Sequence, residues 1–260
     1  MTGEISRAIA STAYQTYEKR LLKEVQSKPV PKHVAVIMDG NRRYAREFGL
    51  LVAEGHEKGK EKLEEMIEWC LELDIRVLTV YAFSTENVAR ERDEVNTLMR
   101  MFAENFRKLA DDSRVHENRI RVRVLGQKEI LPPDVQESIR YSEERTKGYD
   151  SYFFNLAVGY CGREELIQAV RRIAAEVREG RMRIEDIDEK AFDRFLYTSD
   201  LPDPDLILRT SGEERISNFL LWQLAYSELY FSDVYWPGFR KVDFLRAVRS
   251  YQLRKRRFGE

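Results

Sequence analysis

Polar residues follow directly after three short apolar runs of this 260-residue sequence. Asp39-Gly-Asn-Arg-Arg43 comes after the first run, Ser84-Thr-Glu-Asn87 after the second, and Arg209-Thr-Ser-Gly-Glu-Glu-Arg215 after the third. If the runs are parallel strands, their carboxyl ends open on one rim of the sheet, where such sheets bind ligands. The rim would then gather an acid, several arginines, and hydroxyl and amide groups. Arginine forks and backbone N–H groups at helix starts suit a diphosphate.

A carboxylate among these cations also has a chemical use. Mg²⁺ binds through one or two carboxylates plus substrate phosphates, so Asp39 alone is enough to anchor it at the rim. Plainer interpretations stay open: Asp39 as a helix cap and Arg209 as the partner of a structural carboxylate. His56, which follows Gly55, could simply begin a helix, and Glu228 on its own resembles an ordinary surface acid.

The sequence lacks the common nucleotide-binding motifs. No G-x-G-x-x-G follows an apolar run, and segment 55–60 is too short for a Walker A loop and precedes Glu61 instead of Ser or Thr. Asp111-Asp112 lacks a third aspartate at the spacing of the paired-aspartate motif, and it falls late in a helical pattern. We interpret this pair as solvated surface. A nucleotide-binding or phosphosugar-binding protein is therefore a weak alternative.

The elements that must position these residues alternate along the chain. Apolar runs predict strands, and helical spacing of apolar residues predicts helices between them. This alternation predicts an α/β fold, with a single domain whose central, mainly parallel sheet is covered by helices on both faces. The expected strands are 33–38, 75–83, 120–125, 152–158 and 206–208, and the helical patterns cover 63–71, 95–109 and 166–177.

The two ends of the chain are expected to be helical. A surface helix over Glu4–Gln26, followed by a proline-containing break, predicts an N-terminal helical extension over residues 1–29 beside a main domain over 30–260. The modest apolar face of this helix favours packing or solvation over membrane contact. A last helix is expected from about Val242 to Arg257. We interpret the aromatic-rich segment 219–236 as a dimer interface.

Bulk composition excludes several classes of protein. The 44 Lys and Arg residues nearly balance the 45 Asp and Glu residues, so no overall field attracts nucleic acid, and we expect no nucleic-acid partner. Cys70 and Cys161 have neither disulfide-type nor metal-type spacing, and Cys70 lies on an apolar stripe that predicts a core position. The chain also lacks a signal-peptide pattern and a membrane-length apolar run. We therefore expect a soluble, cytoplasmic protein.

Ordered motifs extend over roughly residues 30–258. The first is His33-Val-Ala-Val-Ile-Met-Asp-Gly-Asn-Arg-Arg-Tyr-Ala45, and the others are Gly55-His56 with Gly59, 81–87 with Arg90 and Glu94, 155–160, 205–213, 215–223, Glu228-Leu-Tyr-Phe231 and Trp236-Pro237. In content and order they closely resemble the signatures of the undecaprenyl diphosphate synthase family, the cis-prenyltransferases. So many ordered motifs make chance agreement implausible.

The resemblance implies a Mg²⁺-dependent cis-prenyltransferase with its catalytic domain over residues 30–260. Such an enzyme condenses isopentenyl diphosphate with an allylic diphosphate, such as farnesyl or geranylgeranyl diphosphate, to give a longer Z-polyprenyl diphosphate. The product would serve a lipid glycosyl carrier. The resemblance also implies a homodimer, an apolar tunnel whose length sets product length, and at most peripheral membrane contact through the product.

Matching positions also imply roles for single residues. Asp39 and Asn87 would be catalytic, and Asp39 and Glu228 would hold the metal. Isopentenyl diphosphate would be bound by Arg209, Arg215 and Ser217. The allylic diphosphate would be bound by Gly40, Asn41, Arg42, Arg43, Tyr44, His56, Ser84, Thr85, Glu86 and Arg90. The group that takes the proton stays unassigned.

Three departures from the family pattern limit the resemblance. Val52 stands where many bacterial members carry an arginine, which puts one phosphate contact in doubt. Tyr44 replaces the usual tryptophan but keeps an aromatic wall, and Cys161 replaces a glycine, which predicts a less permissive turn. The main rival is a non-catalytic partner subunit of a two-component enzyme. Such subunits typically lose the acid and basic residues of the first motif, whereas Asp39 and Arg43 are present here.

Overall fold

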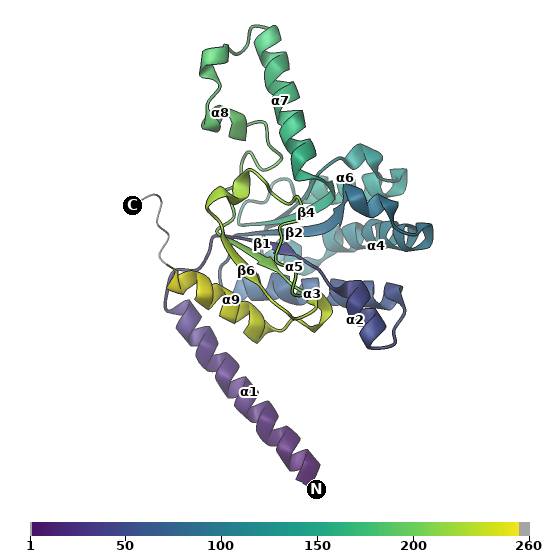
Figure 1. Cartoon of the computed structure of the whole chain (residues 1–260), viewed down its shortest axis with the longest axis vertical. Coiled ribbons are helices and arrows are strands. Elements are labelled where there is room, and N and C mark those ends of the chain that lie inside the picture. The colour runs from purple at the N-terminus through teal and green to yellow at the C-terminus, as the bar shows by residue number, and fades with distance from the viewer. Residues whose placement is uncertain (1, 255–260) are drawn as a thin grey trace.

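The computed structural model describes residues 2–254, with side chains from residue 13 onward. These residues fold around one sheet of six strands in the order β3-β4-β2-β1-β5-β6, and every strand pair is parallel (Figure 1). The predicted parallel α/β sheet is thus confirmed. The strands are β1 (His33–Ile37), β2 (Val77–Ser84), β3 (Ile120–Leu125), β4 (Tyr152–Tyr160), β5 (Leu206–Arg209) and β6 (Glu228–Phe231).

Strand β6 was not predicted from the sequence. It pairs with β5 at the edge of the sheet, and its four residues are all half-buried. The strand therefore has neither a fully apolar run nor a clear alternation, which are the two patterns that identify strands.

The helices occupy most of the remaining chain. They are α1 (Thr2–Gln26), α2 (Asn41–Glu47), α3 (Val52–Glu72), α4 (Arg92–Asp111), α5 (Ser113–Glu117), α6 (Pro133–Thr146), α7 (Gly162–Arg178), α8 (Glu189–Asp193) and α9 (Lys241–Leu253). Helix α9 ends before the expected Arg257, and residues 255–257 lie outside the described residues.

The two faces of the sheet are covered differently. Val34 and Val36 of β1 pack into the large core that includes side chains of α3, α4, α6 and α9. Ala35 and Ile37 point to the other face, against Phe219 and Leu220 of an irregular segment. Over β1, this second face is therefore covered in part by an irregular segment. Long apolar side chains of a loop do the same work there, because burial needs apolar area and no particular secondary structure.

The interpretation of segment 219–236 as a dimer interface does not hold for two of its aromatic residues. Phe219 and Trp236 are fully buried inside the chain's own core. The indole Nε1 of Trp236 also donates a hydrogen bond to the carbonyl oxygen of Gly59, at 2.7 Å. These two aromatic residues therefore stabilise the fold of the single chain.

Helix α1 runs away from the body of the molecule, but its C-terminal end packs against α9 (Figure 1). Leu21 and Val25 are fully buried and belong to the main core. The predicted N-terminal extension is therefore joined to the main domain through the C-terminal end of α1. Ile5, Ala8 and other residues of its N-terminal part lie outside the described side chains. No helix within residues 2–254 is long and apolar enough to cross a membrane.

Candidate active site

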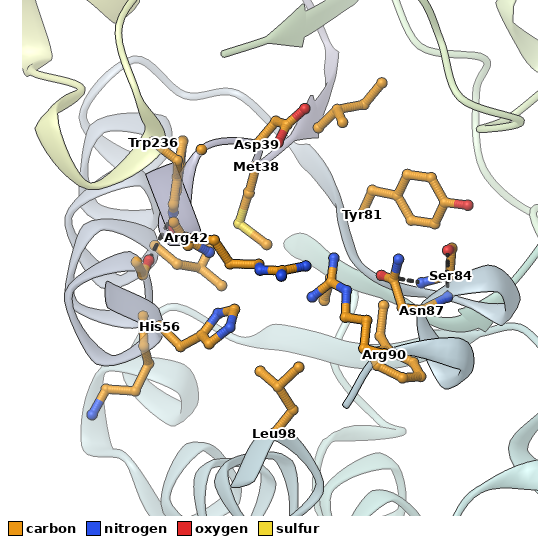
Figure 2. A pocket seen from close by; sticks show the side chains of 18 of the residues that line it. Met38, Asp39, Arg42, His56, Tyr81, Ser84, Asn87, Arg90, Leu98 and Trp236 are labelled. Atoms are coloured by element: carbon orange, nitrogen blue, oxygen red, sulfur yellow. Dashed lines mark hydrogen bonds between the residues drawn. The ribbon is translucent and has the colours of Figure 1, made fainter. Parts of the chain in front are cut away.

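A cavity of about 820 Å³ opens at the carboxyl ends of the strands, as expected for a parallel sheet (Figure 2). Its walls come from β1, α2, α3, β2, the 3₁₀-helix η1 (Thr85–Ala89), α4 and the loop after β5. Most of the predicted site residues line it: Asp39, Gly40, Asn41, Arg42, Arg43, His56, Ser84, Glu86, Asn87, Arg90, Arg209 and Ser217. The structure thus brings together three loops that are far apart in the sequence.

Gly40 makes the turn from β1 into α2. Its φ is 108°, in the region that favours glycine, and an added Cβ would lie 3.0 Å from atoms of Tyr235. This turn directs the start of α2, at Asn41, toward the cavity. Unpaired N–H groups at a helix start favour an anion, so the turn suits a phosphate group.

Two glycines of α3 let α2 approach closely. A Cβ on Gly55 would lie 2.5 Å from the carbonyl oxygen of Asn41, and one on Gly59 would lie 2.5 Å from its Oδ1. Larger residues at these positions would push α2 away from α3. The Gly55-His56 and Gly59 motif therefore sets the position of the first wall of the cavity.

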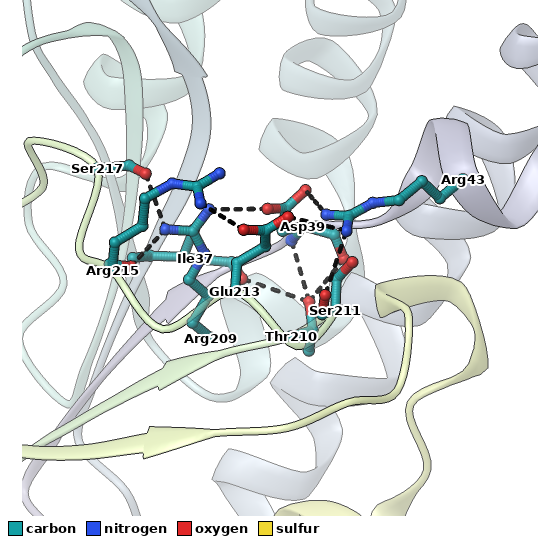
Figure 3. A network of polar contacts seen from close by, with 9 residues as sticks. All are labelled: Ile37, Asp39, Arg43, Arg209, Thr210, Ser211, Glu213, Arg215 and Ser217. Carbon is teal, nitrogen blue, oxygen red and sulfur yellow. Dashed lines mark hydrogen bonds and ion pairs between the residues drawn. The ribbon is translucent and has the colours of Figure 1, made fainter.

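Asp39 lies between two arginines (Figure 3). Its Oδ2 accepts a hydrogen bond from Arg209 Nη2 at 2.8 Å, and its Oδ1 lies 3.2 Å from Arg43 Nη2. Burial raises the pKa of the Asp39 carboxyl, but the hydrogen bond and charge of Arg209, with the charge of Arg43, outweigh burial and lower it. Asp39 is therefore ionised at neutral pH, with 30% of its side chain exposed.

Thr210 fixes the main chain of Asp39, and its role was not predicted from the sequence. Its hydroxyl donates to the carbonyl oxygen of Asp39 at 2.7 Å and lies 3.0 Å from the Asp39 N–H. These contacts join the ends of β1 and β5. The position of Thr210 directly after Arg209 was the signal that could have identified it.

Arg209 also contacts the loop that follows it. Its Nη1 donates to Ser217 Oγ at 2.8 Å and to the carbonyl oxygen of Arg215. The side chain of Arg215 is 63% exposed and pairs with Glu213, which also accepts from Arg43 at 3.0 Å (Figure 3). Arg209 and Ser217 thus lie together as predicted, while the Arg215 side chain does not line the cavity.

Ser84 and Asn87 orient each other at the end of β2. The Asn87 N–H donates to Ser84 Oγ at 3.2 Å, and the Ser84 N–H donates to Asn87 Oδ1 at 3.1 Å (Figure 2). This reciprocal cap fixes the Asn87 side chain. Since its oxygen is occupied, its Nδ2 group is the end suited to donate to a phosphate oxygen.

The wall opposite Asp39 carries further cations. Arg42 of α2 and Arg90, which follows η1, extend into the cavity beside His56 of α3 (Figure 2). All three contact the carboxylate of Glu94, a residue that the sequence motif contains but to which we assigned no role. Arg46 and Lys60 also line the cavity, so it has further cations although Val52 replaces an arginine of the family pattern.

Besides Arg215, three predicted site residues do not line the cavity. Tyr44 packs on Phe48, with ring centroids 4.5 Å apart, and Thr85 lies in η1 outside the lining. Glu228 begins β6 opposite Leu206, at the amino-terminal end of the sheet, and pairs with Arg254 at 2.6 Å. Its predicted part in the metal site is therefore not supported, because it lies at the wrong end of its strand to join Asp39 in this chain.

Cys161 does not strain the chain. Its φ of −151° is an ordinary extended conformation that any residue adopts, so the expected conformational cost of replacing glycine does not arise. Its sulfur accepts a hydrogen bond from Asn218 Nδ2 at 2.9 Å. Asn218 lines the cavity beside Ser217, so Cys161 helps to hold this loop.

A smaller cavity of about 140 Å³ continues from the first between α3 and α4. The two cavities share wall residues, including Leu63, Phe102 and Leu156. Much of the wall of the second cavity is apolar, with Ile67, Leu71, Phe106, Leu109, Val115, Ile120 and Phe154. The fold therefore has the expected apolar tunnel behind a polar opening.

The residues present fit a magnesium ion only together with a substrate. Within residues 2–254 there is no group of three or more His, Cys, Asp or Glu side chains that could hold a metal. Asp39 is a single accessible carboxylate, and Mg²⁺ characteristically combines one or two carboxylates with phosphate oxygens and water. The donor set therefore suits a metal that arrives with a diphosphate.

Comparisons with known proteins agree with this geometry. Residues 37–259 match the Prenyltransf family model, which describes undecaprenyl diphosphate synthases. The tritrans,polycis-undecaprenyl-diphosphate synthase (geranylgeranyl-diphosphate specific) of Thermoplasma acidophilum is 54% identical over 98% of this chain and 99% of its own length. The enzyme with the same description from Pyrococcus horikoshii is 53% identical over 99% and 97%.

A solved structure has the same fold. The crystal structure of lavandulyl diphosphate synthase from Lavandula x intermedia, in complex with dimethylallyl diphosphate, superimposes with a TM-score of 0.85. It is 40% identical and covers 89% of this chain and 99% of its own. Together with the family match and the shared motifs, these similarities show that the chain belongs to the undecaprenyl diphosphate synthase family of cis-prenyltransferases.

Proposed function

We propose that this cis-prenyltransferase extends geranylgeranyl diphosphate with isopentenyl diphosphate, with Mg²⁺ bound, to give a long Z-polyprenyl diphosphate. The observation that carries the proposal is the cation-lined cavity that continues into an apolar one. Such a site holds a diphosphate at the opening and a hydrocarbon tail behind it. The primer follows from the relatives at 53–54% identity, whose names specify geranylgeranyl diphosphate.

The allylic diphosphate is placed at the start of α2. Gly40 and Asn41 offer backbone N–H groups there, and Arg42, Arg43 and Arg90 supply charge around the same cavity. The allylic tail then points toward Leu63 and Phe102 and into the apolar cavity. Each added isoprenoid unit buries more carbon, at about 0.8 kcal/mol per methylene, so the space between α3 and α4 sets product length.

Isopentenyl diphosphate is placed on the other side of Asp39. Arg209 and Ser217 lie within hydrogen-bond distance of each other and line the same cavity. With both substrates held, the isopentenyl double bond attacks the allylic carbon as the bond to its diphosphate breaks. A proton then leaves the isopentenyl unit and the new double bond forms. Asn87 and the arginines stabilise the departing diphosphate, and Asp39 would hold Mg²⁺, which would supply further positive charge there.

The wider assignments are also part of the proposal. Helix α7 projects from the body and exposes Ile167 and Val170 on one face, and Ile184 nearby is exposed too (Figure 1). A second copy of the chain would cover these apolar side chains, which supports a homodimer. We further infer a cytoplasmic enzyme that supplies a lipid glycosyl carrier and meets a membrane only through its product.

Product analysis tests the proposal. The purified protein is incubated with labelled isopentenyl diphosphate, Mg²⁺ and dimethylallyl, geranyl, farnesyl or geranylgeranyl diphosphate, and the products are separated by thin-layer chromatography. We expect long Z-products, most efficiently from geranylgeranyl diphosphate, and none after chelation of Mg²⁺. No turnover alone, but turnover after a second subunit is added, would instead identify the chain as a non-catalytic partner subunit.

A further inference from the structure

One buried carboxylate holds two arginines and a histidine of the cavity wall together. Glu94 Oε1 accepts from Arg90 Nη1 at 3.1 Å and lies 3.2 Å from His56 Nε2. Its Oε2 lies 3.6 Å from Arg42 Nε. The three partners come from α2, α3 and the segment after η1, so Glu94 connects three separate parts of the wall.

Glu94 is buried behind the cavity wall, whereas the residues that it contacts line the cavity. The Glu94 side chain is only 8% exposed and does not line the cavity, whereas Arg42, Arg90 and His56 all do. A ligand in the cavity would therefore meet the cations and leave Glu94 behind them. The carboxylate can act on a ligand only through the groups that it holds.

The charges explain why such a group is needed. Arg42 and Arg90 extend toward each other in the cavity (Figure 2), and the charge of each opposes the other. One carboxylate offsets part of this repulsion and leaves a net positive wall that can still bind an anion. Burial lowers the pKa of His56, and the Arg90 and Arg42 charges lower it further, while Glu94 opposes these effects.

We propose that Glu94 is a positioning residue that holds Arg42, Arg90 and His56 as one preformed binding wall for the allylic diphosphate. This inference rests on the proposed function. Without Glu94 the two guanidinium groups would separate, and the substrate would have to bring them together again. Preorganised groups bind more tightly because that cost is met during folding.

The variant Glu94→Gln tests the proposal, because it keeps the shape and removes the charge. We expect the KM for the allylic diphosphate to rise about tenfold, equivalent to about 1.4 kcal/mol, while the KM for isopentenyl diphosphate changes less than about twofold. Glu94→Asp keeps the charge and should recover most of the loss. Glu91→Gln is the matched control: it removes the same charge from the exposed residue just before α4, and both KM values should stay as in the wild type.

A second measurement does not depend on turnover. The chain has three histidines, so an NMR titration of the imidazole signals can follow His56, assigned with His56→Gln. Arg42, Arg90 and Glu94 face His56, and Lys60 lies one turn further along its own helix. We expect a lower His56 pKa in Glu94→Gln than in the wild type, and no change in Glu91→Gln, because only Glu94 contacts the imidazole.

The outcomes separate this inference from the proposed function. An unchanged allylic KM with an unchanged His56 pKa in Glu94→Gln would overturn it. Equal increases in both KM values with a lowered melting temperature would also overturn it, since they would show a merely structural role. If the wild type makes no polyprenyl product, the proposed function fails, while the His56 titration still decides whether Glu94 organises the wall.

Discussion

Two carboxylates, one in the cavity wall and one behind it, each contact two arginines, and their settings differ. Asp39 is 30% exposed, lines the cavity and is held by Arg209 and Arg43. Glu94 is 8% exposed and lies behind the arginines that it binds. An acid that faces the cavity can exchange its arginines for a metal ion once phosphate oxygens attract the guanidinium groups. A buried acid cannot exchange partners without leaving a charge unpaired, so it is suited to support. Position relative to the cavity, more than residue type, separates the two roles.

The largest expected effect comes from the exposed acid. Asp39→Asn removes the charge that we propose would hold Mg²⁺ against the departing diphosphate, but keeps an acceptor for Arg209. We expect kcat to fall by about a hundredfold to a thousandfold with nearly normal substrate binding, because the contact matters mainly in the transition state. Steady-state kinetics measure this. Asp150→Asn, which removes a surface carboxylate paired with Arg119, serves as the control. Full activity of Asp39→Asn would remove the distinction between the two acids.

A smaller effect is expected at the arginine that joins Asp39 to the second substrate loop. Arg209→Ala removes a guanidinium group that is 4% exposed and contacts Asp39 and Ser217. Hydrogen bonds to charged groups contribute about 1.5–3 kcal/mol, so the KM for isopentenyl diphosphate should rise roughly 10-fold to 100-fold. The allylic KM should change much less. Equal effects on both substrates would show that the two subsites are assigned wrongly.

The packing that brings α2 to the cavity can be tested through stability. Gly55→Ala would place a Cβ 2.5 Å from the Asn41 carbonyl oxygen, so α2 or α3 must shift. We expect the free energy of unfolding to fall by about 2 kcal/mol, as in other overpacked sites. Gly148→Ala is the matched control, because no heavy atom lies within 4 Å of its Cβ position. Denaturant unfolding compares the two, and equal stabilities would show that the close approach is not needed.

His33 of β1 is a buried histidine whose ring nitrogens contact a carbonyl oxygen and a hydroxyl group. His33 Nδ1 donates to the Pro202 carbonyl oxygen at 2.7 Å, so Nε2 accepts from the Thr79 hydroxyl at 2.8 Å. Burial lowers the His33 pKa from 6.5 to about 4. The unfolded chain therefore binds a proton that the folded chain does not, and stability falls as pH drops from 6.5 toward 4.

We expect a loss of about 1 kcal/mol from His33 between pH 6.5 and pH 5.5. The pKa of His56 is also lowered, so this residue contributes with the same sign. Denaturant unfolding at several pH values in this range should show that the free energy of unfolding falls less steeply with decreasing pH in His33→Asn than in the wild type. The same pH dependence of the free energy of unfolding in both proteins would show that His33 does not control this acid sensitivity.

The sequence predicted the elements whose patterns are local. The β1 and β3 segments are continuous apolar or alternating runs, and the structure places them within one residue of the expected bounds. The half-buried edge strand β6 has no such pattern. The position of Glu228 along its strand also depends on pairing between distant segments, which periodicity does not reveal.

In the candidate site, too, some residues could be predicted from local sequence and others only from the folded chain. The motif around Asp39 could be recognised because residue type and position after a strand suffice to suggest anion binding. Glu94 was not assigned, because an acid in the first turn of a helix is expected from the helix dipole alone. Only the folded chain shows that it faces His56 and two arginines. Likewise, Arg215 pairs with Glu213 and does not line the cavity, which spacing does not indicate.

The contact between the first and last helices has a consequence for biosynthesis. Leu21 and Val25 leave the ribosome long before the α9 segment against which α1 packs. Their apolar side chains must therefore wait, uncovered, through nearly all of translation. A nascent chain that stops before residue 241 should bind chaperones at this segment, and premature termination near the 3′ end of the message should give an aggregation-prone product.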